Sequence, residues 1–597
     1  MKIVTTRRIA QIFFLVLFLW FSIASTLGEK WWQLRGWPVN LFLQLDPLVG
    51  LGTFITTRTF YSGLIWSIVT IVLTIILGRF FFCFLCPFGA IHQFVGFLGK
   101  RKKTKPQKSR VNAYHKAQSI KYIILTFLLS AAAIDFLFDS DIHSNIHSDI
   151  LSSSLQIGLL DPIPLLHRSV NLVLLPLMDE PVLNLSPHQR YYETSWIIGS
   201  IFLAAVILNL VIPRFYCRYI CPLGALLGVL SRFSLWRIGQ RKGKCTDCKL
   251  CETDCEGACE PGGAIRISEC VLCMNCLHTC PDDLVGFSTK VSVSGETVSP
   301  DIERRELIAA VISSAVLIPS LRLSGHTGPN WNPNLIRPPG SLDESAFLSR
   351  CIKCGQCMRV CPTNIIQPTG LQAGIEGIWT PTLNFRIGTS GCQLNCIACG
   401  NVCPTAAIRP ISLDEKLGKK KYTEKGPIKI GTAFVDRNRC LPWAMNKPCI
   451  VCQENCPVSP KAIYTKESFE RIRTDEDLRV ESADTNQVFL ENDILKPNKF
   501  GTGDYFIKIL NSHDTSLRLV SSNTANSISI PERLSWQQSP QSGNRIDIFV
   551  RVQKPFVDPE KCIGCGVCEH ECPITGKRAI RVSRENESRN KRHKFVL

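Results

Sequence analysis

The N-terminal half of this chain is built on one repeated phrase, GRFFFCFLCPFGAIHQ at residues 78–93 and PRFYCRYICPLGALLG at residues 213–228. Each copy runs from an Arg-Phe pair through two cysteines into a Pro-x-Gly-Ala turn. The cysteines are Cys83 and Cys86 in the first copy, and Cys217 and Cys221, one residue further apart, in the second. Because the match spans several residue types, it indicates an internal duplication.

Each copy follows an apolar segment of the length that a membrane crossing needs. Four such segments approach the ~20 residues of a bilayer span, at roughly 9–28, 63–82, 121–138 and 194–213. Arg7, Arg8 and the basic block 100–110 flank them, and such residues mark the cytoplasmic side. We therefore expect two hairpins whose ends lie in the cytoplasm. The loops 29–62 and 139–193 would face outward, each with an Asp-Pro pair, at Asp46 and Asp161.

Two interpretations stand for the four cysteines of the repeat. Free cysteine is often a small buried apolar residue. Alternatively, two pairs at equivalent places could serve thiol–disulfide exchange or bind a soft metal through four thiolates. The sequence does not show whether Cys83 and Cys86 meet Cys217 and Cys221.

Composition places the chain among multi-domain metalloproteins. It has 597 residues, a net charge of +19 and 29 cysteines, and its length predicts several domains. Much of the positive charge lies beside the apolar segments, so it fits lipid headgroups better than nucleic acid, and we expect no nucleic-acid partner. Most cysteines fall in runs separated by two, two and three residues, a spacing that thiolate-bound clusters need and disulfide frameworks do not.

Two complete runs, CTDCKLCETDC and CVLCMNCLHTCP, follow the second copy of the repeat. Three closely spaced thiolates hold one [4Fe–4S] cluster, while the fourth reaches the neighbouring cluster. The first cluster is therefore expected on Cys245, Cys248, Cys251 and Cys280. The second is expected on Cys270, Cys273, Cys276 and Cys255. One cysteine of the pair Cys255 and Cys259 is spare, and spacing favours Cys255 as the ligand.

Paired arginines, Arg304 and Arg305, open an apolar stretch that ends near residue 320. It is a short core helix, an amphipathic segment that lies against the module, or a twin-arginine export signal retained as an anchor. We favour the export signal, which puts the rest of the chain in the periplasm.

Four more runs follow, and each ends in Cys-Pro. They supply Cys351, Cys354, Cys357 and Cys361; Cys392, Cys396, Cys399 and Cys403; Cys440, Cys449, Cys452 and Cys456; and Cys562, Cys565, Cys568 and Cys572. With the first two runs they predict six [4Fe–4S] clusters. Residues 466–555 interrupt the pattern with alternating apolar phrases, which predict a β-rich insertion.

The expected fold is multi-domain, an α-helical membrane bundle of two duplicated hairpins plus α+β ferredoxin-like 4Fe–4S modules. The expected boundaries are 1–235 for the membrane domain, 236–290 for a two-cluster module, 300–322 for the anchor helix and 340–597 for a four-cluster domain.

In order, these features resemble two families joined end to end. Residues ~1–290, with CFLCP, CRYICP and a two-cluster module, are similar to NapH/NosR-type membrane ferredoxins. Residues ~300–590, with twin arginines and the wide run CLPWAMNKPCIVCQENCP, are similar to NapG/MauM-type ferredoxins. The resemblance implies a quinol dehydrogenase component that feeds a periplasmic reductase. It also implies that the outer runs, 351–361 and 562–572, share one cluster pair and the inner runs the other.

The leading functional hypothesis is an electron conduit in the bacterial cytoplasmic membrane, from the quinol pool to a periplasmic reductase or cytochrome, with quinone as a second cofactor. The alternatives are a NosR-like regulatory or maturation protein, and a metal reductase that uses the membrane cysteine pairs. No dinucleotide-binding fingerprint or C-x-x-C-H haem motif occurs in the sequence. His92, His115 and His167 could handle quinol protons, although surface or headgroup-facing positions are the commoner case.

One physical difficulty accompanies this hypothesis. About 30 Å of hydrocarbon would separate a cytoplasmic module from a periplasmic one. Electrons need a carrier to cross that distance.

Overall fold

The computed structural model describes residues 3–27, 32–101, 103–134, 153–179, 188–243, 245–298, 300–323, 332, 334–472, 477–510 and 516–589. The chain forms two compact units. The first comprises Met1–Thr389, Asn395–Ile428 and Arg589–Lys591, and the second Ser390–Leu394, Lys429–Ser588 and Arg592–Leu597. The duplicated half and the first cysteine module therefore share one unit with the start of the second ferredoxin half.

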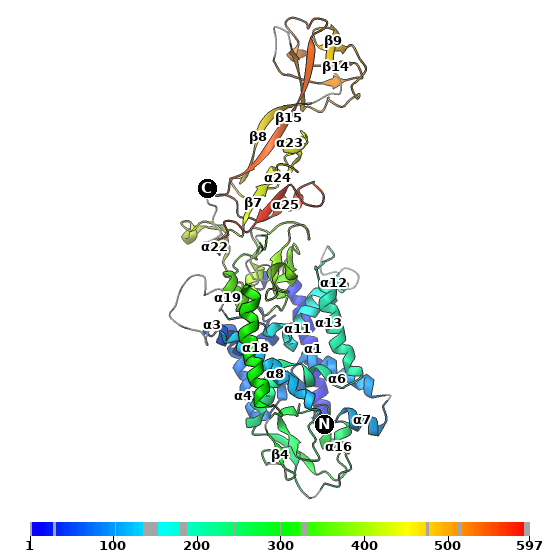
Figure 1. Cartoon of the computed structure of the whole chain (residues 1–597), viewed down its shortest axis with the longest axis vertical. Helices are drawn as coiled ribbons and strands as arrows, with labels where there is room; N and C mark the ends of the chain where they lie inside the picture. The colour runs from blue at the N-terminus through cyan, green and yellow to red at the C-terminus, as the bar shows by residue number, and fades with distance from the viewer. Residues whose placement is uncertain are drawn as a thin grey trace. The chain divides into compact units, whose positions relative to one another are not determined.

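Helices form the duplicated half (Figure 1). The longer ones are α1 Ile3–Ala24, α3 Pro47–Thr57, α4 Trp66–Leu77, α6 Pro87–Lys100, α8 Ile120–Ala132, α11 Pro162–Ser169, α13 Ser195–Ile207 and α15 Pro222–Leu230. The shorter ones are α2 Leu41–Gln44, α5 Phe80–Phe84, α7 Lys105–Val111, α12 Leu175–Met178 and α14 Phe215–Tyr219. The order α4–α5–α6 recurs as α13–α14–α15, so the repeated phrase folds the same way twice.

The predicted spans correspond to α1, α4, α8 and α13. Within the described residues, one helix, α1 continued to Leu27, has the length and apolar character to cross a membrane by itself. The apolar helices at 47–57, 62–77, 162–178, 195–211 and 222–233 are shorter. The end of the third predicted span, residues 135–138, lies outside the described residues. The two-hairpin membrane bundle stays a prediction.

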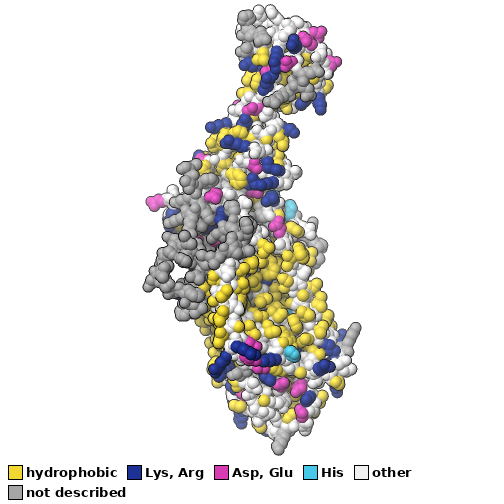
Figure 2. Space-filling view, in the orientation of Figure 1, with side chains coloured by type: hydrophobic (Ala, Val, Ile, Leu, Met, Phe, Trp, Pro, Cys, Tyr) yellow, Lys and Arg dark blue, Asp and Glu magenta, His cyan; other side chains and the backbone are white. Residues whose placement is uncertain are grey.

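The outer surface of these helices is strongly apolar. Figure 2 shows hydrophobic side chains gathered over the helical part of the first unit, with charged side chains beyond its lower end. Trp66, Trp196 and Ile312 are 58%, 72% and 57% exposed. A contiguous apolar surface of this kind is typical of contact with lipid or another protein.

The loops predicted to face outward contain helices that enter the core, and the side of the membrane on which they lie stays a prediction. Asp46 and Asp161 are both completely buried and cap α3 and α11, each followed by a proline at the first helical position. Asp46 accepts the N–H of Leu48 at 2.9 Å, and Asp161 accepts that of Ile163 at 3.2 Å. An Asp N-cap followed by Pro is a strong helix start, and the apolar residues after it bury these helices.

Cysteine modules lie at both ends of α1. Near its start, the guanidinium of Arg7 donates to the carbonyl of Cys273. Beyond its end, Thr26 accepts hydrogen bonds from Arg359 at 3.0 and 3.2 Å. Since Arg7 and Thr26 are 19 residues apart and a helix rises 1.5 Å per residue, these contacts are about 28 Å apart.

The twin-arginine stretch is a single helix, α18 Arg304–Leu323, which packs along α8. Ala310, Ser314 and Ile318 form its buried stripe, and Ile318 contacts Ala131 of α8. Lys116 pairs with Glu303 at 2.8 Å before the two helices, and Arg322 pairs with Glu376 at 2.8 Å at the end of α18. The chain therefore passes along α18 from the first cysteine module to the second.

Small sheets and single-turn helices carry the cysteine runs. In the first unit β1 Arg237–Gln240 pairs with β3 Val285–Ser288, β2 Ile265–Arg266 with β4 Glu296–Thr297, and β5 Ile366–Pro368 with β6 Pro381–Leu383. Its short helices are α16 Leu250–Thr253, α17 Cys276–Thr279, α19 Glu344–Leu348, α20 Gln356–Arg359, α21 Ala398–Asn401 and α22 Leu413–Leu417.

The second unit combines a cysteine module with a β-domain. Its module pairs β7 Thr432–Val435 with β16 Ile580–Ser583 and contains α23 Leu441–Ala444, α24 Val451–Glu454 and α25 Val567–Glu571. Among the described residues, an eight-stranded sheet is formed by β8 Ile463–Arg471, β9 Leu478–Ala483, β10 Gln487–Leu490, β11 Tyr505–Leu510, β12 Arg518–Leu519, β13 Ser522–Asn523, β14 Ser527–Ser529 and β15 Arg545–Val557. Val480, Val488 and Ile548 belong to its own buried core.

Candidate iron–sulfur sites and the buried thiols of the repeat

All 29 cysteines lie in the described part of the chain, and all of them are free thiols. Within the described residues, no group of three or more His, Cys, Asp or Glu side chains is closed to metal-binding distances. Three sets of four cysteines from the runs line hollows. Burial raises the pKa of Cys351 to about 11 and that of Cys452 to about 12, so a bound metal would have to displace their protons.

Four of the six runs share one loop conformation. The residue two places after the first cysteine is left-handed, at Asp247, Leu272, Lys353 and Gly564, with φ from 52° to 71°. The residue after the second cysteine is left-handed too, at Lys249, Met274, Gly355 and Gly566, with φ from 55° to 77°. Successive turns of this kind direct backbone N–H groups into a concavity that suits an anion. The loops thus fit a negatively charged cluster in both donor atoms and backbone.

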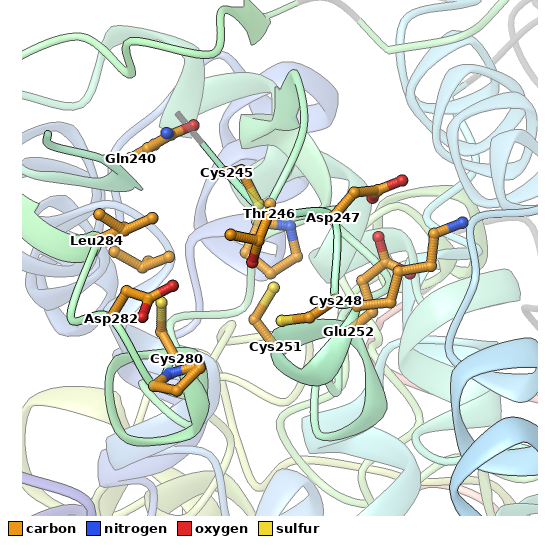
Figure 3. Close-up of a pocket in the computed structure, with 15 residues that line it drawn as sticks. Gln240, Cys245, Thr246, Asp247, Cys248, Cys251, Glu252, Cys280, Asp282 and Leu284 are labelled. Carbon is orange, nitrogen blue, oxygen red and sulfur yellow. The ribbon is translucent and has the colours of Figure 1, made fainter. Parts of the chain in front are cut away.

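The first predicted ligand set is brought together. Cys245, Cys248, Cys251 and Cys280 line one hollow of the first unit, and Figure 3 shows the sulfurs of Cys248, Cys251 and Cys280 turned toward the space between them. A side chain at Gly262 would come within 3.3 Å of the Cys251 sulfur. Cys280, which belongs to the other run, thus lies where a fourth ligand of this set would be needed.

The second set of the first module includes one more thiol than a cluster needs. Cys255, Cys270 and Cys276 are buried in one cluster of side chains together with Cys259. The Cys255 and Cys259 sulfurs are 3.5 Å apart, and Cys259 also interacts with Cys270. Both Cys255 and Cys259 therefore lie where the fourth ligand of this set would be needed. The choice of Cys255 as that ligand stays a prediction.

The structure contradicts the pairing of outer with outer and inner with inner runs. In the first unit one hollow is lined by Cys351, Cys354, Cys357 and Cys403, from the first and second of the four runs. In the second unit another hollow is lined by Cys440, Cys449, Cys452 and Cys572, from the third and fourth runs. Adjacent runs meet because the four cysteines that line each hollow belong to one unit. Cys392 belongs to the second unit, whereas Cys396 and Cys399 belong to the first.

The two cysteine pairs of the repeat converge in the core of the first unit. Cys83, Cys86, Cys217 and Cys221 are at most 2% exposed. Cys217 lies close enough to Cys83, Cys86 and Cys221 for the charges of their thiolates to interact. Cys83 packs against Val271 and Cys273 of the first module. The sequence left this meeting open, since only the packing of the two copies produces it.

Two carboxyl groups meet nearby. Asp46 and Asp161 are both completely buried, and their carboxyl groups lie close enough to interact with one another. Two carboxyl groups buried side by side resist being ionised together, so such a pair favours holding one proton. Sequence reasoning placed both residues in outward loops and missed this pair, although the repeated Asp-Pro was a usable signal.

The histidines do not behave alike. His115 is exposed and accepts the N–H of Ala117 at 3.1 Å. His92 and His167 are completely buried, so the expectation of surface or headgroup-facing positions is wrong for these two. His92 Nδ1 is 2.7 Å from the Asn209 amide oxygen, and the ring of His167 packs edge-on against Phe18.

Comparison with known proteins agrees with these sites. Three family models, each described as a 4Fe-4S binding domain, match residues 59–106 with 194–242, residues 347–367, and residues 553–574. The chain is 30% identical to Protein NirI of Paracoccus denitrificans over 42% of this chain and 33% of that protein. It is 44% identical to a Regulatory protein NosR of Pseudomonas aeruginosa over 11% of this chain and 69% of that sequence.

The chain belongs to the NosR/NirI type of iron–sulfur electron-transfer proteins. This NosR/NirI-type chain is also 34% identical to the Ferredoxin-type protein NapG of Escherichia coli, over 21% of this chain and 50% of that protein. It spans about a third of the length of several curated relatives, 38%, 33% and 28% for the first three. No solved structure matches it. NosR/NirI-like relatives point to a membrane protein.

Proposed function

We propose that this protein relays electrons from the quinol pool of the bacterial cytoplasmic membrane, through six [4Fe–4S] clusters, to a periplasmic reductase or cytochrome. The observation that carries the proposal is the placement of cysteine modules at the two ends of α1, whose contacts at Arg7 and Thr26 are about 28 Å apart. A protein that only stored electrons on one side of a membrane would need no such arrangement.

The residues present suit each part of this task. Quinol oxidation releases two electrons and two protons. Asp46 and Asp161, two buried carboxyl groups that interact with one another, supply a buried acceptor for one proton, and the thiolate sites supply single-electron carriers. The apolar surface around Trp66 and Trp196 supports a membrane-embedded, multi-pass helical part. The passage of the chain along α18 supports a periplasmic C-terminal half.

The test is EPR on anaerobic membranes that contain the full chain, before and after addition of a menaquinol analogue. We expect reduced-cluster signals with quinol and their loss when a periplasmic acceptor fraction is added. In Asp46→Asn/Asp161→Asn protein, reduction by quinol should slow at least about tenfold while reduction by dithionite is unchanged. Asp343→Asn, at the exposed N-cap of α19, is the matched control and should behave as wild type.

A second function is favoured by the name of the Regulatory protein NosR relatives. A regulatory or maturation protein would hold clusters that dithionite reduces and quinol does not. That result would overturn the quinol relay and leave the regulatory function.

A further inference from the structure

The four buried thiols of the repeat form an additional site that the six cysteine runs do not use. Cys83 and Cys86 come from the first copy, and Cys217 and Cys221 from the second, so the site has the twofold character of the duplication. The matched segments 59–106 and 194–242 contain these four thiols and end before the first ferredoxin run. We propose that Cys83, Cys86, Cys217 and Cys221 together hold one iron–sulfur cluster, a seventh centre between the two modules.

Backbone N–H groups already point at two of the sulfurs. Cys86 is the N-cap of α6 and accepts the N–H of Gly89 at 3.3 Å. Cys221 is the N-cap of α15 and accepts the N–H of Gly224 at 3.1 Å. A helix N-terminus stabilises negative charge, so each sulfur is placed to act as a thiolate.

Two buried arginines complete the electrostatics. Arg79 and Arg214 occupy equivalent positions of the repeat, and each is 1% exposed. Arg214 Nη2 donates to the Cys83 sulfur at 3.4 Å. Among the described residues, Arg79 Nη2 and Arg214 Nη1 have no hydrogen-bond partner, and Arg79 Nη2 lies beside Gly224 and Cys221. Four thiolates around an oxidised iron–sulfur core carry two negative charges. Arg214 already pairs with Glu256 at 2.7 Å, whereas a pair of disulfides would leave the buried Arg79 without a charge among these sulfurs to balance it.

The site lies on a continuous route between the two modules. On one side, Cys83 contacts Cys273 of the first module. On the other side, Tyr216 lies close enough to Cys217, Cys221 and Arg168 for its charge to interact with theirs. Arg168 is completely buried and donates to the carbonyl of Lys353 at 3.1 Å, next to Cys354.

The centre therefore divides the distance along α1 into shorter transfers. One electron leaves the reduced cluster at Cys270, Cys273 and Cys276, which returns to its oxidised state, and the four-thiol cluster is reduced by that electron. A second transfer reoxidises it and reduces the cluster at Cys351, Cys354, Cys357 and Cys403. No bond forms or breaks and no proton moves. The reductant is quinol in the proposed relay and dithionite in the test, and the inference stands even if quinol is not the physiological donor.

The test compares iron and acid-labile sulfide in the anaerobically purified full chain with those in the Cys83→Ser/Cys217→Ser variant. We expect the variant to lose about two to four iron atoms and as many sulfides per chain, together with one EPR signal after dithionite reduction. The EPR signal of the cluster at Cys270, Cys273 and Cys276 should become narrower, because its paramagnetic neighbour is lost. Ala90→Ser/Ala225→Ser perturbs the same two helices with all thiols kept, and should retain full iron content.

The serine variant could lose iron because it misfolds, so a second variant keeps all four thiols. Arg214→Lys removes the planar donor to the Cys83 sulfur, so it should retain iron and lower the reduction potential of one signal. Equal iron and unchanged spectra in the serine variant would overturn the proposal. Zinc in place of iron, or a mass that shows Cys83 or Cys217 in a disulfide, would overturn it too.

Discussion

Glu344 shows how a single residue ties the second ferredoxin half to a distant part of the chain. Its carboxylate accepts hydrogen bonds from Arg337 at 2.5 Å and from Arg589 at 2.9 Å, and it is 3% exposed. Burial alone would raise the pKa of Glu344, but the two guanidinium groups outweigh burial and hold that pKa at about 2. A carboxyl with a lowered pKa stabilises the fold above its ordinary pKa of 4.5, and this stabilisation is lost as the pH falls toward 2.

Replacing Glu344 by Gln should therefore lower the free energy of unfolding at pH 7 by about 3 kcal/mol, because two buried guanidinium groups lose their counter-charge. The difference from wild type should be smaller at pH 4, because protonation of this carboxyl in the unfolded chain already removes part of the stabilisation. Urea unfolding in detergent at the two pH values measures both effects. The matched control is Glu415→Gln, whose pairing with the half-exposed Arg409 should contribute less than about 1 kcal/mol. Equal effects of the two substitutions would refute this account of Glu344.

Among the elements, α18 matters most for how the chain connects its parts. Its stripe Ala310, Ser314 and Ile318 recurs every four residues and faces α8, while Ile308, Ile312 and Val316 are exposed. The buried and the exposed face of α18 both carry apolar side chains, so the hydrophobicity of the sequence does not tell them apart. Only the packing against α8 shows which face of this helix is internal.

Neighbouring serines test that assignment. Ser314 is completely buried, whereas Ser313 is exposed. Ser314→Leu should overpack the α8–α18 contact and cost about 1–3 kcal/mol, seen as a lower thermal unfolding temperature in detergent. Ser313→Leu adds the same side chain to the outer face and should change that temperature little. If Ser313→Leu were the more damaging substitution, α18 would have to present its opposite face to α8.

For the whole molecule, stability is divided between apolar cores and cluster sites. The β-domain of the second unit has a core of its own, around Val480, Val488 and Ile548. The cysteine loops beside β7 and β16 have little sheet structure, and their ligands come from two runs. Iron should therefore hold the cysteine modules together while the β-domain folds without it.

Removal of iron by an anaerobic chelator should separate these two parts. We expect amide hydrogens of residues 562–572 to lose protection from exchange, while those of β11 and β15 keep it. Reconstitution with iron and sulfide should restore protection. The complementary variant Ile548→Ala should destabilise the β-domain by about 2–5 kcal/mol and leave the EPR signals unchanged. Loss of protection in β11 and β15 on iron removal would contradict this division.

The sequence by itself determined the local chemistry of this protein. Ligand spacing within a run is a covalent property, so Cys245, Cys248 and Cys251 could be assigned to one site, and the duplication could be recognised from residues 78–93 and 213–228. Tertiary structure decided which residues from distant segments of the chain come together. It paired Cys357 with Cys403 rather than with the last run, brought Asp46 to Asp161, and gathered Cys83, Cys86, Cys217 and Cys221. No spacing along the chain encodes these meetings, because they arise from the packing of helices and modules against one another.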